Sequence, residues 1–517
     1  MFSVSDRISV QNALGTVEFV GHVHVWGSQT LAYGIEWDDP ARGKNSGDLD
    51  GISYFTTLAA GAGSFFKATS TKISKPCLFF EAVSLRYASE SNADALSEKV
   101  VFGSKTVENY GFQKLNEILH DIAHLEVIML DHQCIRIAGD PDEMKFNEFS
   151  NNFELNHMFG AETLDLSSNL ITKWSEVGKI MHYFPRLKSI NLNGNRLLDD
   201  TSGNTSDCIF AFPESVISVS LSATFIPAQN LLCLFFPNVT RLELSENNYE
   251  DCDFNNWQVP EKVAELDLSY NKFSLIPLSL NKHTLTLLIL ADNQISSVRQ
   301  LPVFEHIKKL DLRRNAIASF DEIDEIARKF PNLNELRINA CPVFENLTSE
   351  EMTLHLISRL VCEPWVAKLS PTLINKLNGT FLLHLEITNA ELYFISKVKS
   401  GHFSISNTER WKQLVMKYDI HESVRTQISS DDRKIVLSIR KASNPDHELF
   451  SRVFLQKNSV LRLKGVVLKH IAKYILDFSI YYYVNDDQAY GTRQILSDDI
   501  ASLQSLGLSQ NHRIYVL

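Results

Sequence analysis

Residues 242–249 of this 517-residue chain read LELSENNY, and residues 266–273 read LDLSYNKF. The same pattern of two apolar residues around one variable residue, then an asparagine three positions later, recurs at LDLSSNLI (164–171), INLNGNRL (190–197), LILADNQI (288–295), LDLRRNAI (310–317) and, with cysteine at the asparagine position, LRINACPV (336–343). A degenerate copy, VSLSATFI (219–226), fills the long gap, and IMLDHQCI (128–135) precedes the series. Asn247, Asn271, Asn293 and Asn315 are 24, 22 and 22 residues apart, which predicts a solenoid.

The period is that of leucine-rich repeats. In each repeat the two apolar residues of a short strand point into a shared core, and the asparagine side chain satisfies backbone groups where the chain turns. The residue between the apolar positions, with its neighbours on the same face, then lies on the concave surface. We expect a folded protein to contact this surface, since it lacks the basic charge and stacking aromatic residues that RNA requires. The candidate contact residues are Asp165, Glu243, Asp267, Asp311, Arg313 and Arg337. The alternative, that they are solvated strand residues chosen for solubility, stays open.

The regions on either side of the repeats have different textures. Residues 1–76 contain short alternating runs such as GTVEFVG (15–21), which predict a small all-β barrel that ends at Pro76. Residues 77–115 are interpreted as a linker and lead-in. The α/β repeat solenoid with its terminal cap then occupies residues 116–380, and a mixed connecting segment occupies residues 381–433.

The last region, residues 434–517, shows the order strand, strand, helix, strand, short turn and strand, which predicts an α+β ubiquitin-like (β-grasp) domain. Its helix is predicted at residues 459–474 behind an N-cap at Ser459. The apolar stripe of this helix consists of Leu463, Val466, Val467, His470, Ile471 and Tyr474. The chain is therefore predicted to be multidomain.

Composition excludes several classes of function. A net charge of −12 disfavours nucleic acid and anionic membrane as partners, and no apolar run is long enough to span a bilayer. The first residues lack the features of a signal peptide, and the seven cysteines form no C-x-x-C pair, so we expect a cytoplasmic protein. The sequence contains no nucleotide-binding, zinc-protease or serine-hydrolase motif. We therefore expect no enzymatic activity, no cofactor and no metal site.

A glycine-rich stretch at residues 34–55, GIEWDDPARGKNSGDLDGISYF, is the remaining candidate site. Its run Gly43-Lys44-Asn45-Ser46-Gly47, followed by Gly51, an aromatic pair and GAGSFF (61–66), resembles the signature of CAP-Gly domains. These domains bind the acidic, aromatic-ended tail of α-tubulin. The resemblance implies that Lys44 and Asn45 hold the tail carboxylate and that Phe65 lines the slot for the last side chain.

The residue chemistry agrees with a carboxylate site. Gly43 and Gly47 permit close backbone approach, Lys44 adds a positive charge and Asn45 adds an amide donor. Two positions depart from the family pattern, since Ser46 stands where aspartate is usual and Ala32 stands where many members have tryptophan. Trp26, Tyr33 or Trp37 are then candidates for the missing aromatic wall. For Trp37, as for Tyr54 and Phe55, a place in the core is the favoured interpretation.

The order CAP-Gly domain, leucine-rich repeats and ubiquitin-like domain resembles the tubulin-folding cofactor E family. The resemblance implies a chaperone that captures α-tubulin and acts with other tubulin-folding cofactors and β-tubulin on assembly or dissociation of the heterodimer. It also implies an association with the cytoskeleton. Two alternatives stay open: a CAP-Gly microtubule adaptor, and a ubiquitin-pathway adaptor that docks on the proteasome through its ubiquitin-like domain.

Overall fold

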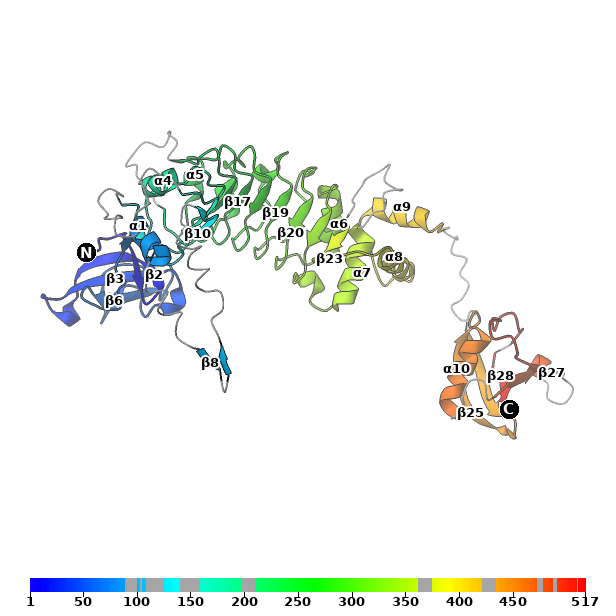
Figure 1. Cartoon of the computed structure of the whole chain (residues 1–517). Coiled ribbons are helices and arrows are strands. Elements are labelled where there is room, and N and C mark those ends of the chain that lie inside the picture. The colour runs from blue at the N-terminus through cyan, green and yellow to red at the C-terminus, as the bar shows by residue number, and fades with distance from the viewer. Residues whose placement is uncertain are drawn as a thin grey trace. The chain divides into compact units, whose positions relative to one another are not determined.

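The structure is a computed structural model that describes residues 1–88, 100–102, 105–107, 124–139, 159–197, 210–360, 374–420, 434–471, 478–486, 491–508 and 510–517. The chain divides into two compact units, Met1–Asp419 and Ile420–Leu517, and each is described by itself. The first unit contains a small β-domain followed by the solenoid (Figure 1).

The N-terminal β-domain is a four-stranded antiparallel sheet in the order β1 (Arg7–Val10), β2 (Ala13–His22), β3 (Leu31–Trp37) and β6 (Gly63–Lys67). A small hairpin, β4 (Asp48–Leu49) and β5 (Ile52–Ser53), lies between β3 and β6 in the chain. Alternate residues of β3 point into the core, which consists of Phe2, Ile8, Val10, Val17, Tyr33, Ile35 and Trp37. The predicted small all-β domain is confirmed.

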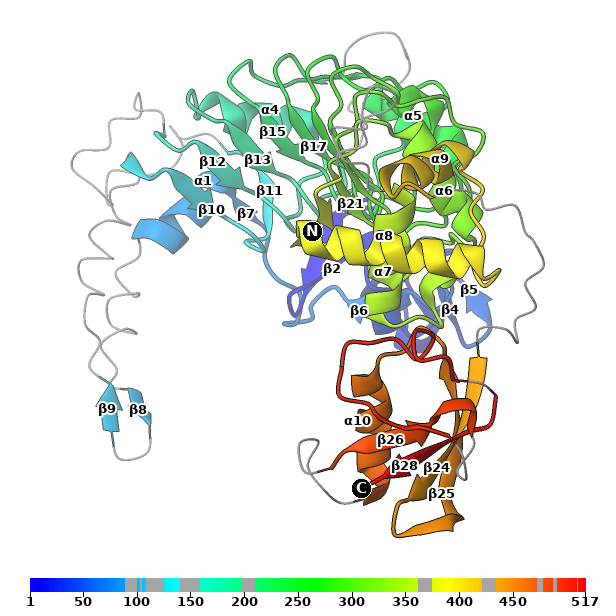
Figure 2. The ribbon, with the colours of Figure 1, turned by 90° about the vertical axis from the view of Figure 1, so that its right-hand side faces the viewer.

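The solenoid is built on an eleven-stranded sheet whose strands follow one another along a curved stack (Figure 2). Its strands are β10 (Val127–Met129), β12 (Thr163–Asp165), β13 (Ser189–Asn191), β15 (Ser218–Ser220), β17 (Arg241–Glu243), β18 (Glu265–Asp267), β19 (Leu287–Ile289), β20 (Lys309–Asp311), β21 (Glu335–Arg337), β22 (Lys376–Leu377) and β23 (Thr380–Phe381). Each repeat segment recognised in the sequence supplies one parallel strand, so the predicted repeats are confirmed.

Shorter elements join these strands. They are α4 (Trp174–His182), α5 (Ala228–Leu231), the pair β14 (Phe210–Ala211) and β16 (Leu234–Phe235), η6 (Asp251–Phe254), η7 (Leu278–Leu280), α6 (Phe320–Lys329) and η8 (Pro342–Phe344). A separate hairpin consists of β8 (Val100–Phe102) and β9 (Lys105–Val107).

The repeat asparagines are buried and link each repeat to the one before it. The Asn271 side chain accepts hydrogen bonds from the backbone N–H groups of Asn247 and Tyr249, both at 3.0 Å. Its amide nitrogen donates to the carbonyl oxygens of Leu244 (3.1 Å) and Leu268 (2.9 Å). The predicted role of these side chains in satisfying backbone groups is thus confirmed.

The N-terminal end of the solenoid begins earlier than the sequence indicated. Strand β7 (Cys77–Leu78) pairs with β11 (Ile135–Ile137), and α1 (Phe79–Val83) buries Phe79 and Phe80 in the solenoid core. Residues 77–88 of the predicted linker are therefore a cap that covers the first repeat. The hairpin of β8 and β9 also belongs to that segment, whose other residues lie outside the described ranges.

The C-terminal cap also extends beyond its predicted boundary at residue 380. The sheet ends in the antiparallel hairpin of β22 and β23, and residues 370–373 of the predicted capping segment lie outside the described ranges. Helices α7 (Ser349–Leu360), α8 (His384–Lys399) and α9 (Thr408–Lys417) follow. Buried ion pairs join them, since Arg359 of α7 binds Asp324 of α6 at 2.9 Å and Arg410 of α9 binds Glu391 of α8 at 2.6 Å.

The second unit is a mixed five-stranded sheet with one helix. The strands lie in the order β25 (Asn444–Leu455), β24 (Lys434–Lys441), β28 (His512–Val516), β26 (Ile480–Tyr483) and β27 (Arg493–Ile495), with β24 and β28 parallel. Helix α10 (Val460–Ile471) buries Val460, Leu463 and Val467 in a core of its own. A parallel central pair flanked by hairpins is the β-grasp arrangement, so the predicted fold of this region is confirmed.

Candidate functional site

The glycine loop, residues 43–47, is held tightly against residues 61–63 at the start of β6. The backbone N–H groups of Lys44 and Asn45 donate to the Gly63 carbonyl at 2.7 and 3.1 Å, and the Gly63 N–H donates back to Asn45 at 2.7 Å. A Cβ atom on Gly43 would lie 1.9 Å from the Gly61 oxygen, and one on Gly47 would lie 2.0 Å from the Phe55 oxygen. Both positions therefore require glycine, because no side chain fits between the two segments.

Asn45 and Lys44 present unused donors at this loop. The Asn45 Oδ1 atom accepts a hydrogen bond from the Gly47 N–H at 3.1 Å, which fixes the orientation of the amide. Its Nδ2 group then donates to no other described residue. Lys44 is exposed and has no ion-pair partner in the part of the chain that the structure describes. An oriented amide N–H next to a free ammonium group is suited to bind a carboxylate.

Ser46 joins the glycine loop to the following loop. Its Oγ atom accepts a hydrogen bond from the Gly61 N–H at 2.9 Å, and its own N–H donates to Asp48 at 3.2 Å. The hydroxyl oxygen supplies the acceptor that a carboxylate at this position would otherwise supply. Although Ser46 departs from the family pattern, the glycine loop thus keeps its hydrogen bond to the loop at Gly61.

An aromatic cluster of Phe19, Tyr54, Phe55 and Phe65 lies on the outer side of β3. The Phe65 ring centroid is 5.3 Å from that of Phe55, 5.5 Å from that of Tyr54 and 6.3 Å from that of Phe19. A Cβ atom on Gly34 would lie 2.3 Å from the Phe55 ring, so the rings pack against bare backbone. Phe65 was predicted to line the slot, whereas Phe19 and Tyr54 were not assigned to the wall.

Two of the three predicted wall residues are in the core instead. Tyr33 and Trp37 are only 3% and 4% exposed, and both point to the inner side of β3. The Trp37 indole donates to the Ser64 hydroxyl at 2.9 Å. Neither residue supplies aromatic surface, so the suggestion of a wall residue is wrong for Tyr33, and the favoured interpretation of Trp37 as a core residue is confirmed. Trp26 lies in the short helix η1 (His24–Trp26), where the Lys67 ammonium is 5.8 Å from its ring centroid.

The predicted concave residues lie in one row across the solenoid sheet. The last residues of neighbouring strands are paired, in the order Asp165, Asn191, Ser220, Glu243, Asp267, Ile289, Asp311 and Arg337. The guanidinium Nε of Arg313 donates to both carboxylate oxygens of Asp311 at 2.9 Å. The sheet thus brings all six predicted contact residues to one continuous face.

Comparison with known proteins shows what this arrangement is similar to. A family model of the CAP-Gly domain matches residues 4–71. Protein PAC2 of Saccharomyces cerevisiae is 27% identical over 501 residues, which cover 93% of this chain and 91% of PAC2. Tubulin-specific chaperone E is 26% identical over 384 residues in Drosophila melanogaster (69% of this chain, 70% of that protein) and 24% identical over 544 residues in Pongo abelii (97% and 96%). The chain is a relative of tubulin-specific chaperone E. The N-terminal β-domain is its CAP-Gly domain.

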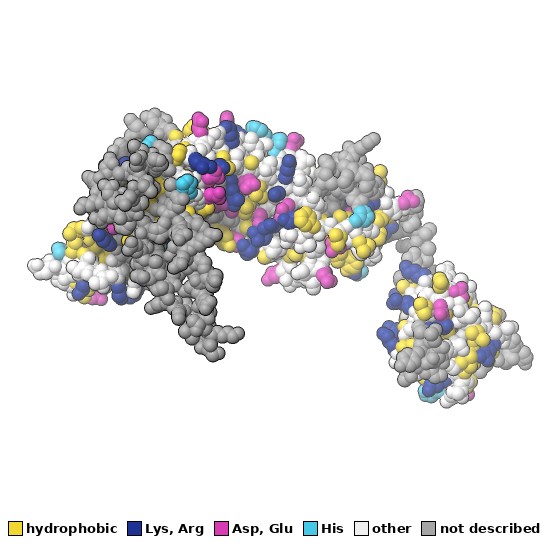
Figure 3. All heavy atoms as spheres, viewed as in Figure 1, with side chains coloured by type: hydrophobic (Ala, Val, Ile, Leu, Met, Phe, Trp, Pro, Cys, Tyr) yellow, Lys and Arg dark blue, Asp and Glu magenta, His cyan; other side chains and the backbone are white. Residues whose placement is uncertain are grey.

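Charge on the concave face of this relative of tubulin-specific chaperone E is largely compensated within the face. Arg241 binds Glu243 at 2.7 Å, and Arg337 and Lys376 both bind Glu335 at 3.1 Å. Figure 3 shows side chains of both signs intermingled over the solenoid. Asp267 has no cationic partner among the described residues, and its burial, together with Glu243 and Asp311, raises its pKa.

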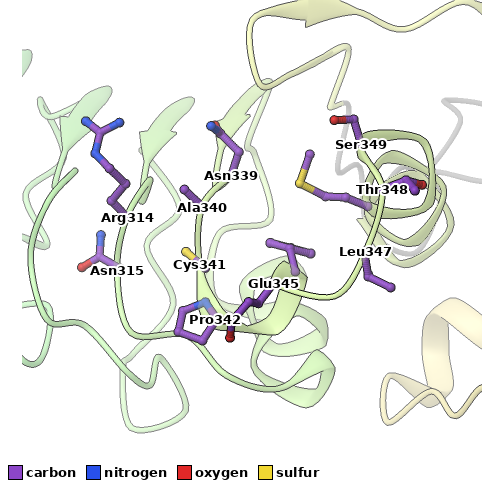
Figure 4. Close-up of a pocket in the computed structure, with 12 residues that line it drawn as sticks. Arg314, Asn315, Asn339, Ala340, Cys341, Pro342, Glu345, Leu347, Thr348 and Ser349 are labelled. Atoms are coloured by element: carbon purple, nitrogen blue, oxygen red, sulfur yellow. The ribbon is translucent and has the colours of Figure 1, made fainter.

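A pocket of about 590 Å³ lies at the C-terminal end of the repeats, between the loops after β20 and β21 and the start of α7 (Figure 4). Arg314, Asn315, Cys341, Pro342 and Met352 contribute to its lining. Cys341 is buried, and burial raises the pKa of its thiol, which makes it a weak nucleophile.

Two features of other functional classes are absent from the described residues. These residues contain no group of three side chains placed to hold a metal ion. They also include no helix with the length and apolarity needed to cross a bilayer.

Proposed function

We propose that this protein is a tubulin-binding chaperone that captures α-tubulin through two binding sites. The C-terminal tail of α-tubulin binds at a tail site that consists of the glycine loop and the aromatic cluster, and the body of the subunit binds the concave row. The supporting observation is the oriented, otherwise unused amide of Asn45 next to exposed Lys44, together with the half-buried Phe65 of the aromatic cluster, in a chain related along most of its length to tubulin-specific chaperone E.

The side chains of the tail site explain why a C-terminal carboxylate with an aromatic side chain is the proposed ligand. A C-terminal carboxylate accepts hydrogen bonds from the Asn45 amide and attracts the Lys44 ammonium, while the terminal aromatic side chain packs on the Phe65 ring. The chain's net charge of −12 opposes an acidic tail at long range, so the tail affinity is modest and the repeats supply most of the binding energy.

The chaperone acts in the cytoplasm, where it assists folding, assembly or dissociation of the tubulin heterodimer together with other tubulin-folding cofactors and β-tubulin. The separate β-grasp unit is a docking module for one of these partners or for the proteasome.

The test measures binding of a fluorescent α-tubulin tail peptide, with and without its terminal aromatic residue, by anisotropy. Lys44→Ala and Asn45→Ala are each expected to weaken binding of the full peptide about tenfold, as loss of a charge-assisted hydrogen bond does. Lys72→Ala is the matched control, because Lys72 is an exposed lysine of the same domain with no ion pair among the described residues. Equal affinity of both peptides for all variants would show that the glycine loop is only structural.

A second measurement addresses the chaperone activity itself. The purified protein is incubated with native tubulin dimer, and α-tubulin is expected to elute with it from a gel-filtration column. Decoration of intact microtubules without loss of polymer would instead support the adaptor alternative.

A further inference from the structure

The CAP-Gly domain is fastened to the solenoid through one shared carboxylate. Asp38 follows the last residue of β3 and forms an ion pair with Arg7 of β1, in which Arg7 Nη1 is 2.7 Å from Asp38 Oδ1. Arg196 of the solenoid reaches the same Oδ1 atom with its Nη2 group at 3.1 Å. Two arginines from two domains therefore share a single anion.

Arg196 is built into the edge of the solenoid. It directly follows the repeat asparagine Asn195, its guanidinium lies 4.3 Å from the ring centroid of Phe225, and it donates a hydrogen bond to the carbonyl of Ala223. Burial and the nearby charge of Arg7 lower its pKa to about 10, so it is still charged at neutral pH. The degenerate repeat at 219–226 supplies Phe225 and Ala223, and these two residues thus hold the Arg196 guanidinium group in place.

Loss of the shared carboxylate would leave the guanidinium groups of Arg7 and Arg196 without this anionic partner. The side chain of Arg7 is 0% exposed and that of Arg196 is 18% exposed, so water cannot fully replace the carboxylate as their partner. Arg196 is the member whose removal leaves the Arg7–Asp38 pair of the CAP-Gly domain intact. A substitution of Arg196 therefore tests the contact between the domains separately from the folding of each domain.

Further contacts fix the orientation of the CAP-Gly domain. Arg136 of β11, in the first repeat, binds Asp6 at 2.5 Å. A cleft of about 430 Å³ lies between the two domains, with Glu36, Asp38 and Leu58 on one side and Arg196, Phe225 and Lys272 on the other. Glu36 accepts a hydrogen bond from the Leu58 N–H at 2.6 Å, and the loop that carries Leu58 continues to Gly61, which contacts Ser46 of the glycine loop. The loop that contacts the glycine loop is thus also a wall of the interdomain cleft.

We propose that Arg196 is a positioning residue, whose contact with Asp38 holds the tail site at a fixed place relative to the concave row. The tail site and the concave row can then bind one tubulin molecule at the same time. This inference rests on the proposed function. A fixed spacing gives the second contact a high effective concentration, whereas a domain that swings freely dilutes it.

The test compares two ligands on the full chain. In Arg196→Ala the affinity for the isolated tail peptide is expected to stay within about twofold of wild type, while the affinity for native tubulin falls by about 10-fold to 100-fold, because only the bivalent ligand needs the fixed spacing. Arg196→Lys keeps one charged contact and is expected to recover part of the tubulin affinity. Lys272→Ala, which changes the same cleft at a residue with no ion pair among the described residues, is the control and is expected to leave both affinities unchanged.

Hydrogen exchange provides a readout that does not depend on tubulin. Amides of residues 36–42 and 223–226 are expected to exchange faster in Arg196→Ala, and amides of β19 to be unaffected. Unchanged tubulin affinity, or an equal loss of tail-peptide affinity, would overturn the positioning role. A wild-type protein that binds neither ligand would instead contradict the proposed function.

Discussion

At the scale of single residues, Gly43 and Gly51 are glycines for different reasons. Gly43 has an ordinary φ of −68°, but a Cβ atom there would meet the Gly61 carbonyl. Gly51 has a φ of +82° and open space around it, so only the left-handed backbone opposes a side chain. The stretch from Gly43 to Gly51 therefore depends on close approach of two segments at its first glycine and on backbone conformation at its last.

This difference predicts unequal effects of the same substitution. Gly43→Ala is expected to separate residues 43–47 from residues 61–63, to destabilise the CAP-Gly domain by about 3 kcal/mol and to abolish tail binding. Gly51→Ala is expected to cost about 1 kcal/mol. Hydrogen exchange of the β3 and β6 amides measures both effects, and equal protection in the two variants would contradict the proposed packing of the loop.

His355 in α7 provides a pH dependence in the C-terminal cap. Its ring lies between Phe320 and Phe403, with centroid separations of 4.3 and 4.4 Å. Burial and the charge of Arg359 lower its pKa to about 4, and Glu351 opposes this only in part. Because the unfolded chain binds a proton near pH 6.5 and the folded chain does not, stability is complete above that pH and is lost as the pH falls toward 4.

The expected size of this loss is roughly 3 kcal/mol between pH 7 and pH 4. His355→Phe keeps the ring packing and removes the titrating group, so its midpoint of thermal unfolding is expected to depend less on pH between 7 and 4. Circular dichroism of both proteins across this range measures the difference. Parallel pH profiles would show that His355 does not contribute.

At the scale of elements, the buried asparagines connect one repeat to the next. Asn271→Ala removes the partners of five backbone groups at once, and the expected destabilisation is about 3 kcal/mol. Asn281→Ala is the matched control, since Asn281 is exposed and its side chain makes one hydrogen bond, to the Val303 carbonyl at 3.2 Å. Hydrogen exchange of the amides in β17, β18 and β19 is expected to rise only in Asn271→Ala.

Regular elements were predictable from the sequence, and interruptions of regularity were not. The repeats and helix α10, including the Ser459 N-cap, follow from periodicity, and Ser459 does accept a hydrogen bond from the Arg462 N–H at 3.3 Å. Phe19 was missed because the pairing of β2 with β3 shifts between Val17 and Phe19. This irregularity turns Phe19 to the outer side, opposite to the core residue Val17, so strict alternation assigns it to the wrong face.

At the scale of the whole molecule, the two units have separate cores. The core of the second unit consists of residues between Ile435 and Val516, and the solenoid core includes no residue beyond Ala390 among those described. A chain that ends at Asp419 is therefore expected to fold and to bind the tail peptide with unchanged affinity. Thermal unfolding and anisotropy test this, and loss of tail binding on truncation would contradict the independence of the units.

Contacts between distant parts of the sequence were beyond sequence reasoning. Nothing in the pattern around Asp38 or Arg196 indicates that the two side chains meet, because a single ion pair leaves no periodic signal. The sequence also predicts a linker and lead-in at residues 77–115, although Phe79 and Phe80 in this segment lie in the solenoid core.

The reversed hairpin at the end of the solenoid sheet has a consequence for self-association. A stack of parallel strands presents open hydrogen-bonding groups at each end, onto which another copy can add in register. Here β22 is two residues long and β23 runs antiparallel to it, so the direction of the strands is broken at the terminus. The repeat array therefore does not offer that end as a template on which further copies could add to form fibres.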